Sequence, residues 1–432
     1  MAILTSKLAY SRKLVYAGLP SAIIGALTVY SARAFISSGG VSLYSSFTLF
    51  STALGFAATL DFGVIRNALL YASNGKSSER YNAILSLIAP IRRRTIAIWL
   101  ITAPLLILSL AGSNQYMTYV CLGIFVVPFQ ILFLTLVACL QGRGYLATSC
   151  IAQIVQGLSV SLVPVLCLSF HTIFKDKVYF FTLLASLYTA AGLVSTYFIY
   201  KLGQPRHSNV IKAVKIAVFA NYSNLRCRDD SKFRSLMALA ALLGLCLSTA
   251  DRFLIASILG LENIQFASYS ASSALALKLL VVPAAVAIIS LPQVRNLKDV
   301  YSFIRRQIKI LAVVFIPVLI LVGAYASPII SYMSDGKADI HSSVLTFRIL
   351  LLGVFFNGAA QTPYNILSIS NRHNWKLLAV GLIELILFAP ILFYMTRTFQ
   401  IVGASITWTL RAIFDFALIS LLACQCGESN AR

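Results

Sequence analysis

Acidic side chains are scarce in this chain of 432 residues, which carries 13 Asp and Glu against 35 Lys and Arg. Charged residues make up only 11% of the sequence, whereas 59% is hydrophobic and the mean hydropathy is +0.85. This balance excludes an ordinary soluble domain, in which about 25% of residues are charged. The formal net charge of +22 would suit nucleic-acid binding, but the placement of the cations indicates membrane topology instead.

Motifs that would carry enzyme chemistry are also missing. The chain has no GxxxxGK[ST] loop, no CxxC spacing among its eight Cys, and no Ser/His/Asp arrangement around its four His. Most of the Cys lie in or beside apolar segments, where buried free thiols are expected rather than a disulfide. We therefore predict no enzyme activity, no metal and no cofactor.

Apolar runs of about 20 residues, the length that a helix needs to cross a bilayer, recur along the whole chain. Twelve runs account for the hydropathy, and together they predict an all-α polytopic membrane protein. Their approximate cores are Leu14–Phe35, Val41–Leu60, Thr95–Leu110, Met117–Cys139, Leu146–Leu168, Tyr179–Tyr200, Leu236–Leu259, Ile264–Leu291, Ile310–Met333, Ser343–Ile369, Leu377–Tyr394 and Ile401–Cys424.

The Lys and Arg residues outside the apolar runs are strongly asymmetric between alternate loops. Only Lys175, Lys177, Lys337 and Arg397 fall in the loops of one side. Because cytoplasmic loops are enriched in Lys and Arg, that side is predicted to face outward and both termini to face the cytoplasm.

One long polar connection, residues 201–235, divides six predicted spans from six. We predict an N-terminal lobe over residues 1–200, a basic cytoplasmic linker over residues 201–235, and a C-terminal lobe with a short cytoplasmic tail over residues 236–432. An even division of this kind is typical of duplicated transporters.

Several short motifs, taken in order along the chain, carry a family resemblance. They are the run Leu60 to Arg66 (LDFGVIR), Leu140 to Gly144 (LQGRG), Asp251 to Ile255 (DRFLI), Lys278 to Pro283 (KLLVVP) with Leu291 and Pro292, and Asn371 to His373 (NRH). With these motifs and its span count, the chain resembles the Wzx-type polysaccharide flippases of the multidrug, oligosaccharidyl-lipid and polysaccharide (MOP) exporter superfamily.

The resemblance implies two six-helix lobes around a central cavity that opens alternately to each side. It implies a lipid-linked oligosaccharide as cargo, undecaprenyl-diphosphate carrying an O-antigen or other surface-polysaccharide repeat unit, moved across a bacterial inner membrane and driven by an ion gradient. Membrane lipids, a polysaccharide polymerase and a chain-length regulator are the implied partners, and no nucleic acid is expected.

Five cations lie within predicted spans, where a charge is costly unless it faces a partner or a wet cavity. Arginine suits a diphosphate because its planar fork donates two hydrogen bonds at once. Lys278 and Arg411 fall near mid-span, whereas the other three lie nearer the outer ends of their spans. The candidate cavity cations are Lys278, Arg252, Arg33, Arg348 and Arg411, with anchoring at the outer interface or ion pairing as the competing explanations.

Buried acids and amides form the remaining candidates. The predicted ion-coupling acids are Glu384, Asp251, Asp415 and Asp61. Two of them have alternative partners: Asp415 follows Arg411 by four residues, and Asp251 precedes Lys278 on the next span. The predicted glycan contacts are Gln153, Gln156, Asn357 and Gln361, for which interhelical hydrogen bonds are the competing account.

Three other functions remain open to different degrees. A multidrug or cation antiporter of the same superfamily is disfavoured by the excess of intramembrane Lys and Arg over acids. A peptidoglycan-precursor flippase would be expected to have two further spans. A membrane-embedded glycosyltransferase or polymerase would need a long outer loop, which the sequence lacks.

Overall fold

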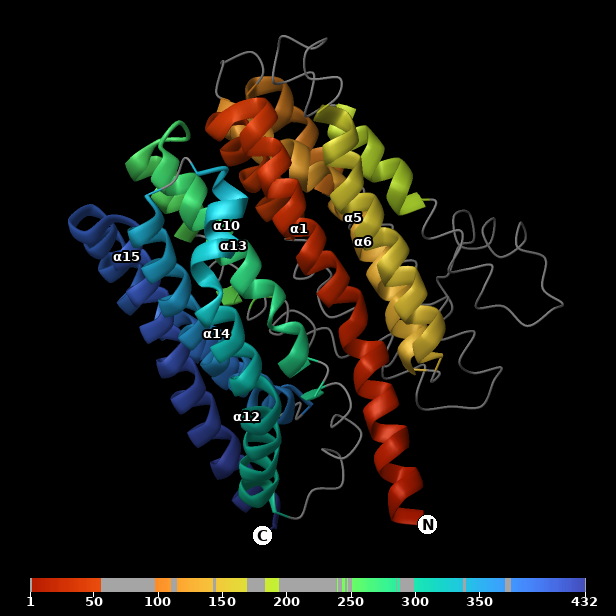
Figure 1. Cartoon of the computed structure of the whole chain (residues 1–432). Helices are drawn as coiled ribbons and strands as arrows, with labels where there is room; N and C mark the ends of the chain where they lie inside the picture. The colour runs from red at the N-terminus through yellow and green to blue at the C-terminus, as the bar shows by residue number, and fades with distance from the viewer. Residues whose placement is uncertain are drawn as a thin grey trace, which may run out of the picture. The chain divides into compact units, whose positions relative to one another are not determined.

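The computed structural model describes residues 2–55, 98–109, 115–142, 145–168, 183–193, 239, 243–244, 247, 251–284, 286–287, 299–336, 339–369 and 374–431. All regular secondary structure in these ranges is helical. The labelled helices are α1 (Ala2–Gly55), α5 (Gln115–Gly142), α6 (Leu146–Leu168), α10 (Ile264–Lys278), α12 (Val300–Ala324), α13 (Ala326–Ser334), α14 (Ile340–Ile369) and α15 (Asn374–Ala431) (Figure 1).

Two of these helices contain breaks at positions where the sequence predicts the end of one span and the start of the next. In α1 the break is at Gly40, with φ 77° and ψ 175°, a conformation that glycine adopts without steric cost. In α15 it is at Gln400, with φ 52° and ψ −132°. Residues 374–399 and 401–431 are therefore two separate helical runs, as the eleventh and twelfth predicted spans require.

The ninth predicted span begins earlier in the structure than its apolar core suggests. The carboxylate of Asp299 accepts a hydrogen bond from the backbone N–H of Ser302 at 3.0 Å and caps the first turn of α12. The basic residues Arg305, Arg306 and Lys309 thus lie on the first turns of a helix and not in a loop. The helix ends at Ala324, and the short helix α13 follows it.

The chain forms two compact units, one made of Met1–Ser45 and Leu239–Arg432 and the other of Ser46–Ala238. In the first unit, α14 packs along α15 and also contacts α10, α12 and α13 (Figure 1). In the second, α5 packs against α6 around Phe133, Val137 and Ala152. The division of the sequence into two six-helix lobes stays a prediction.

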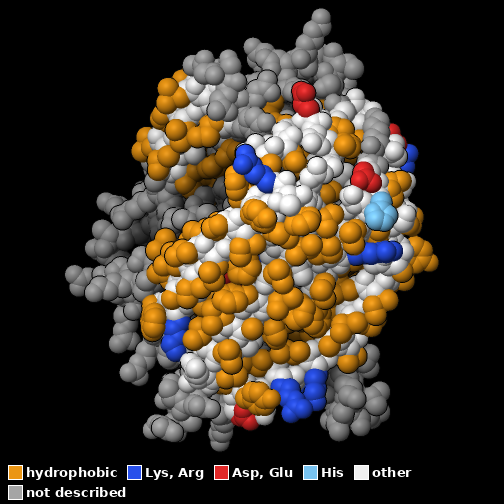
Figure 2. Space-filling model, turned by 90° about the vertical axis from the view of Figure 1, so that its left-hand side faces the viewer, with side chains coloured by type: hydrophobic (Ala, Val, Ile, Leu, Met, Phe, Trp, Pro, Cys, Tyr) orange, Lys and Arg blue, Asp and Glu red, His pale blue; other side chains and the backbone are white. Residues whose placement is uncertain are grey.

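Apolar side chains cover much of the outer surface of the first unit. Val313 and Ile320 of α12 and Ile386 and Leu421 of α15 are all strongly exposed. Figure 2 shows a broad hydrophobic face with most of its charged side chains toward the two ends. Five described helical stretches are long and apolar enough to cross a membrane, so the chain is a multi-pass membrane protein whose apolar surface suits contact with lipid.

Candidate functional site

Two charged residues of the helical segment 251–259 are buried against α10. Asp251 accepts hydrogen bonds from the hydroxyl of Tyr269 and from the backbone N–H of Arg252. The Nε of Arg252 donates to the Oγ of Ser273 at 3.1 Å. Tyr269 and Ser273 are four residues apart and share one face of α10, so a single helix face holds both charged side chains. The guanidinium of Arg252, which could have reached the outer interface, is buried instead.

Lys278 is the last residue of α10, and its side chain is exposed. It lies near enough to Arg252 for the two positive charges to repel. Gly25 of α1 is its neighbour, since a Cβ on Gly25 would lie 3.7 Å from the Cβ of Lys278. Within the described part of the chain, Lys278 forms no ion pair. Its predicted alternative partner, Asp251, contacts Tyr269 instead.

The helix breaks immediately after Lys278. The N–H groups of Leu279 and Leu280 donate to the carbonyls three residues before them, Ala276 and Leu277, at 3.1 and 3.2 Å. This tightening into a 3₁₀ turn comes just before Pro283, which has no N–H to continue the α-helical pattern. The break places Lys278 at a helix C-terminus.

A second charged cluster joins the two helical runs of α15. The Nη1 of Arg411 lies 3.4 Å from the Oε2 of Glu384, and both side chains are buried. Asp415 interacts electrostatically with both of them. From the sequence, the predicted partner of Arg411 is Asp415 in the same helical run. In the structure, the break at Gln400 brings Glu384 opposite Arg411.

A cavity of about 70 Å³ connects the two clusters. Asp251 and Arg411 both line it, and its remaining walls come mostly from apolar residues, including Leu254, Leu385 and Phe388. This volume has room for several water molecules. The Nε of Arg411 and the Oε1 of Glu384 form no hydrogen bond with any described group.

Two other candidate cations lie outside this cluster. The Nη2 of Arg33 in α1 is 3.7 Å from the Oδ1 of Asp335, and its guanidinium lies 4.2 Å from the ring centre of Tyr332. Arg348 of α14 is exposed and donates from Nε to the carbonyl of Gly323 at 3.2 Å. Their assignment to the cavity stays a prediction.

The candidate glycan contacts fall in both units. In the second unit, the amide nitrogen of Gln156 donates to the amide oxygen of Gln130 at 2.5 Å, an interhelical bond between α6 and α5, and Gln153 is half-buried. In the first unit, Asn357 and Gln361 are half-buried on α14. Asp61 lies outside the described residues.

Sequence reasoning missed the groups that position the charges. The sequence does not single out Tyr269 and Gln130, and it offers Ser273 only as a possible sugar contact, although each forms a hydrogen bond to a charged or amide side chain of the candidate site. The spacing of Tyr269 and Ser273, four residues apart on one face of an apolar span, was the available signal.

The fold is that of the MOP-superfamily transporters. The chain is similar to an inward-facing multidrug resistance MATE family transporter of that superfamily, with TM-score 0.61, 13% identity, and 94% of each chain covered. It is similar to the lipid II flippase MurJ in an inward closed conformation, with TM-score 0.62, 12% identity, and 94% of this chain and 86% of that chain covered. The MATE transporter VcmN of Vibrio cholerae matches with TM-score 0.57 and 13% identity over 98% of both chains.

A sequence relative gives a more particular likeness. The chain is 30% identical over 175 residues to a Shigella flexneri protein described as a "Putative O-antigen transporter". The match covers 40% of this chain and 41% of that protein, so it spans about two fifths of the relative's length. No family model matches the chain. These likenesses confirm the resemblance to Wzx-type flippases, and the proteins compared are transporters and flippases, not enzymes, as expected.

Proposed function

We propose that the chain is a flippase that moves a lipid-linked oligosaccharide across a bacterial inner membrane by alternating access. The observation that carries this proposal is the place of Lys278 at the C-terminal end of α10, on the helix that also holds Arg252, with no ion-pair partner for Lys278 among the described residues. Like charges held near one another in a low-dielectric environment repel, and an anionic ligand relieves that repulsion.

The two cations differ in a way that suits a diphosphate. Arg252 is held in place by Ser273 and presents a planar fork, whereas Lys278 is a mobile point charge at the end of α10. Together they would neutralise most of the charge on a diphosphate, while the polyprenyl chain stays in lipid against the apolar outer surface (Figure 2). The likeness to an O-antigen transporter and to a lipid II flippase supports this class of cargo.

The acids of the second cluster are proposed to couple transport to an ion gradient. Glu384 and Asp415 share one arginine, Arg411, and the cavity beside them is also lined by Asp251. The three carboxylates lie near two guanidiniums, those of Arg252 and Arg411, and the remaining negative charge is one that a proton or another cation can balance. The cavity volume gives such an ion room to enter.

The same proposal includes placement in the inner membrane, which the family resemblance implies, and both termini in the cytoplasm, which the distribution of Lys and Arg predicts. The polysaccharide polymerase and the chain-length regulator remain proposed partners.

The test is a flipping assay with the full chain in proteoliposomes that contain a fluorescent undecaprenyl-diphosphate-linked sugar. A membrane-impermeant quencher reports how fast the label moves between leaflets. Lys278→Ala should slow flipping at least tenfold, since a lost charged contact to phosphate is worth about 1.5–3 kcal/mol, and Lys278→Arg should restore part of the rate. Lys309→Ala, which removes an exposed lysine of α12, is the matched control. Equal rates for Lys278→Ala and the parent would reject the proposed site.

A drug or cation antiporter is the second candidate, favoured by the MATE fold and by the acid cluster around the cavity. For that function Glu384→Gln should abolish proton-driven export of a cationic dye, and Lys278→Ala should leave the export intact. Dye export without movement of the lipid-linked sugar would decide in favour of this alternative.

A further inference from the structure

The first helix is fastened to a short helix far away in the sequence. α13 follows α12 directly and ends at Asp335, which has left-handed backbone angles of φ 51° and ψ 35°. In this position the carboxylate of Asp335 meets the guanidinium of Arg33 from α1 at 3.7 Å, and the ring of Tyr332, one turn earlier, lies under the same guanidinium. A single arginine therefore makes both an ion pair and a cation–π contact.

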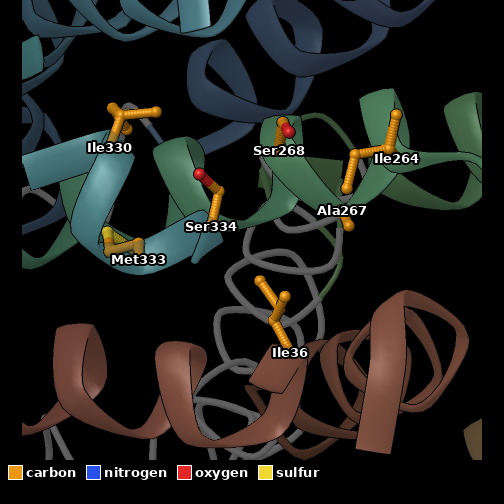
Figure 3. Close-up of a pocket in the computed structure, with 8 residues that line it drawn as sticks. Ile36, Ile264, Ala267, Ser268, Ile330, Met333 and Ser334 are labelled. Atoms are coloured by element: carbon orange, nitrogen blue, oxygen red, sulfur yellow. The ribbon is translucent and has the colours of Figure 1, made fainter. Parts of the chain in front are cut away.

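Near these contacts lies a narrow seam lined mainly by apolar side chains. Ile36 of α1 points toward Ala267 of α10, and Ile330 and Met333 of α13 line the other side (Figure 3). The space left between these side chains is about 10 Å³, which is too small for any ligand larger than a single water. The seam is thus a contact between helices and not a binding pocket.

Both parts of this contact are suited to being broken and re-formed. The side chains of Arg33 and Asp335 are 42% and 33% exposed, and ion pairs at such positions are weak. The seam is formed by only a few apolar side chains. Gly40, seven residues after Arg33, breaks α1, and a Cβ built there would meet nothing within 4 Å. The residues before Gly40 therefore form a separate helical arm.

We propose that Arg33, Tyr332 and Asp335 form a latch that holds the arm of α1 against α13 and α10, and that the latch opens and closes during the transport cycle. Residues 41–55 of α1 follow the arm after the break at Gly40, and those from Ser46 onward belong to the second unit. Release of the latch frees the arm from α13 and α10. Arg33 thus acts on conformation and does not contact the cargo.

The test measures opening of the seam directly and needs no substrate. Ser268 lines the seam, and Ser268→Cys serves as the reporter in the full chain, purified in lipid nanodiscs so that both faces are accessible. The rate of labelling with a polar maleimide reports opening, and the same protein without the reporter gives the background from the native Cys. An exposed ion pair and a cation–π contact together correspond to roughly a tenfold change in an equilibrium constant, so Arg33→Ala should speed labelling about tenfold.

Exchanging the charges of Arg33 and Asp335 distinguishes loss of the latch from a general loss of packing. Asp335→Arg alone should label fast, and the double variant Arg33→Asp/Asp335→Arg should label several-fold more slowly than Asp335→Arg because the ion pair is restored in reverse. Arg397→Ala is the matched control, since Arg397 also stacks on a ring, Phe393, at 4.9 Å but lies outside the latch. A rate unchanged by Arg33→Ala, or a double variant that labels as fast as Asp335→Arg, would overturn the latch and leave the proposed cargo untouched.

Discussion

The ion pair between Arg411 and Glu384 provides the sharpest test of the packing in the first unit. The two charged atoms are 3.4 Å apart, and their side chains are 8% and 3% exposed. At an effective dielectric constant of about 20, two unit charges at this separation attract by about 5 kcal/mol. Desolvation opposes much of that attraction, so the pair itself contributes little net stability. Removal of one partner is different, because it leaves the other charge buried and alone.

We therefore expect Arg411→Met and Glu384→Met each to lower the free energy of unfolding by about 3 kcal/mol. The double variant should lose about the same amount as either single variant. It removes the uncompensated charge that each single variant creates, but it still leaves Asp415 buried without its arginine. The coupling energy from the cycle is then about 3 kcal/mol, at the upper end for residues in contact.

The measurement is SDS-induced unfolding in mixed micelles, followed by far-ultraviolet circular dichroism for the parent, both single variants and the double variant. Arg348→Met serves as the control, because Arg348 is exposed and its Nε donates to the backbone carbonyl of Gly323. Its loss should be below about 1 kcal/mol. Additive losses in the double variant, about 6 kcal/mol in total, would refute the assignment of Glu384 as the partner of Arg411.

Two further changes test local structure. A Cβ on Gly358 would lie 2.5 Å from the Cγ of Pro283, so Gly358→Ala should destabilise the protein by about 1–3 kcal/mol through overpacking at the kink after α10, as measured by the same unfolding titration. The hydrogen bond from Ser302 holds the pKa of the Asp299 carboxyl below its usual value. The Asp299 cap therefore stabilises the helix fully at pH values above the usual pKa of an Asp carboxyl. This stabilisation is lost as the pH falls through the lowered pKa. Amide hydrogen exchange in the first turn of α12 should accordingly be faster in Asp299→Ala than in the parent at neutral pH, with no difference once the parent carboxyl is protonated.

The helices were predictable from the sequence because apolar runs of span length have few alternatives in a bilayer. The breaks at Gly40 and Gln400 fall between predicted spans, and Pro283 kinks its helix as proline requires. The start of α12 was not found, since its first turns are basic and do not resemble a span. The Asp299 cap was the signal that could have located it.

The partners of the charged residues were much harder to predict than the charges themselves. Spacing along one helix offered Asp415 for Arg411, but the ion pair forms with Glu384 across the break at Gln400. The sequence also offered Lys278, on the next predicted span, as a partner for Asp251, whereas the hydroxyl of Tyr269 bonds that carboxylate. Sequence periodicity identifies residues on one helix face, but it does not tell which neighbouring helix that face meets.

The partner of each of the five cations determines how much that cation can contribute to the binding of an anion. A cation that is balanced by an acid adds little to the binding of an anion, because the ligand must compete with the existing carboxylate. Arg411 and Arg33 both have acidic partners, and Arg348 bonds a carbonyl. Lys278 has no such partner in the described chain, and its closeness to Arg252 raises the local positive potential. Anion affinity in the first unit should therefore depend on Lys278 far more than on any of those three arginines, although all five residues are cations within apolar spans.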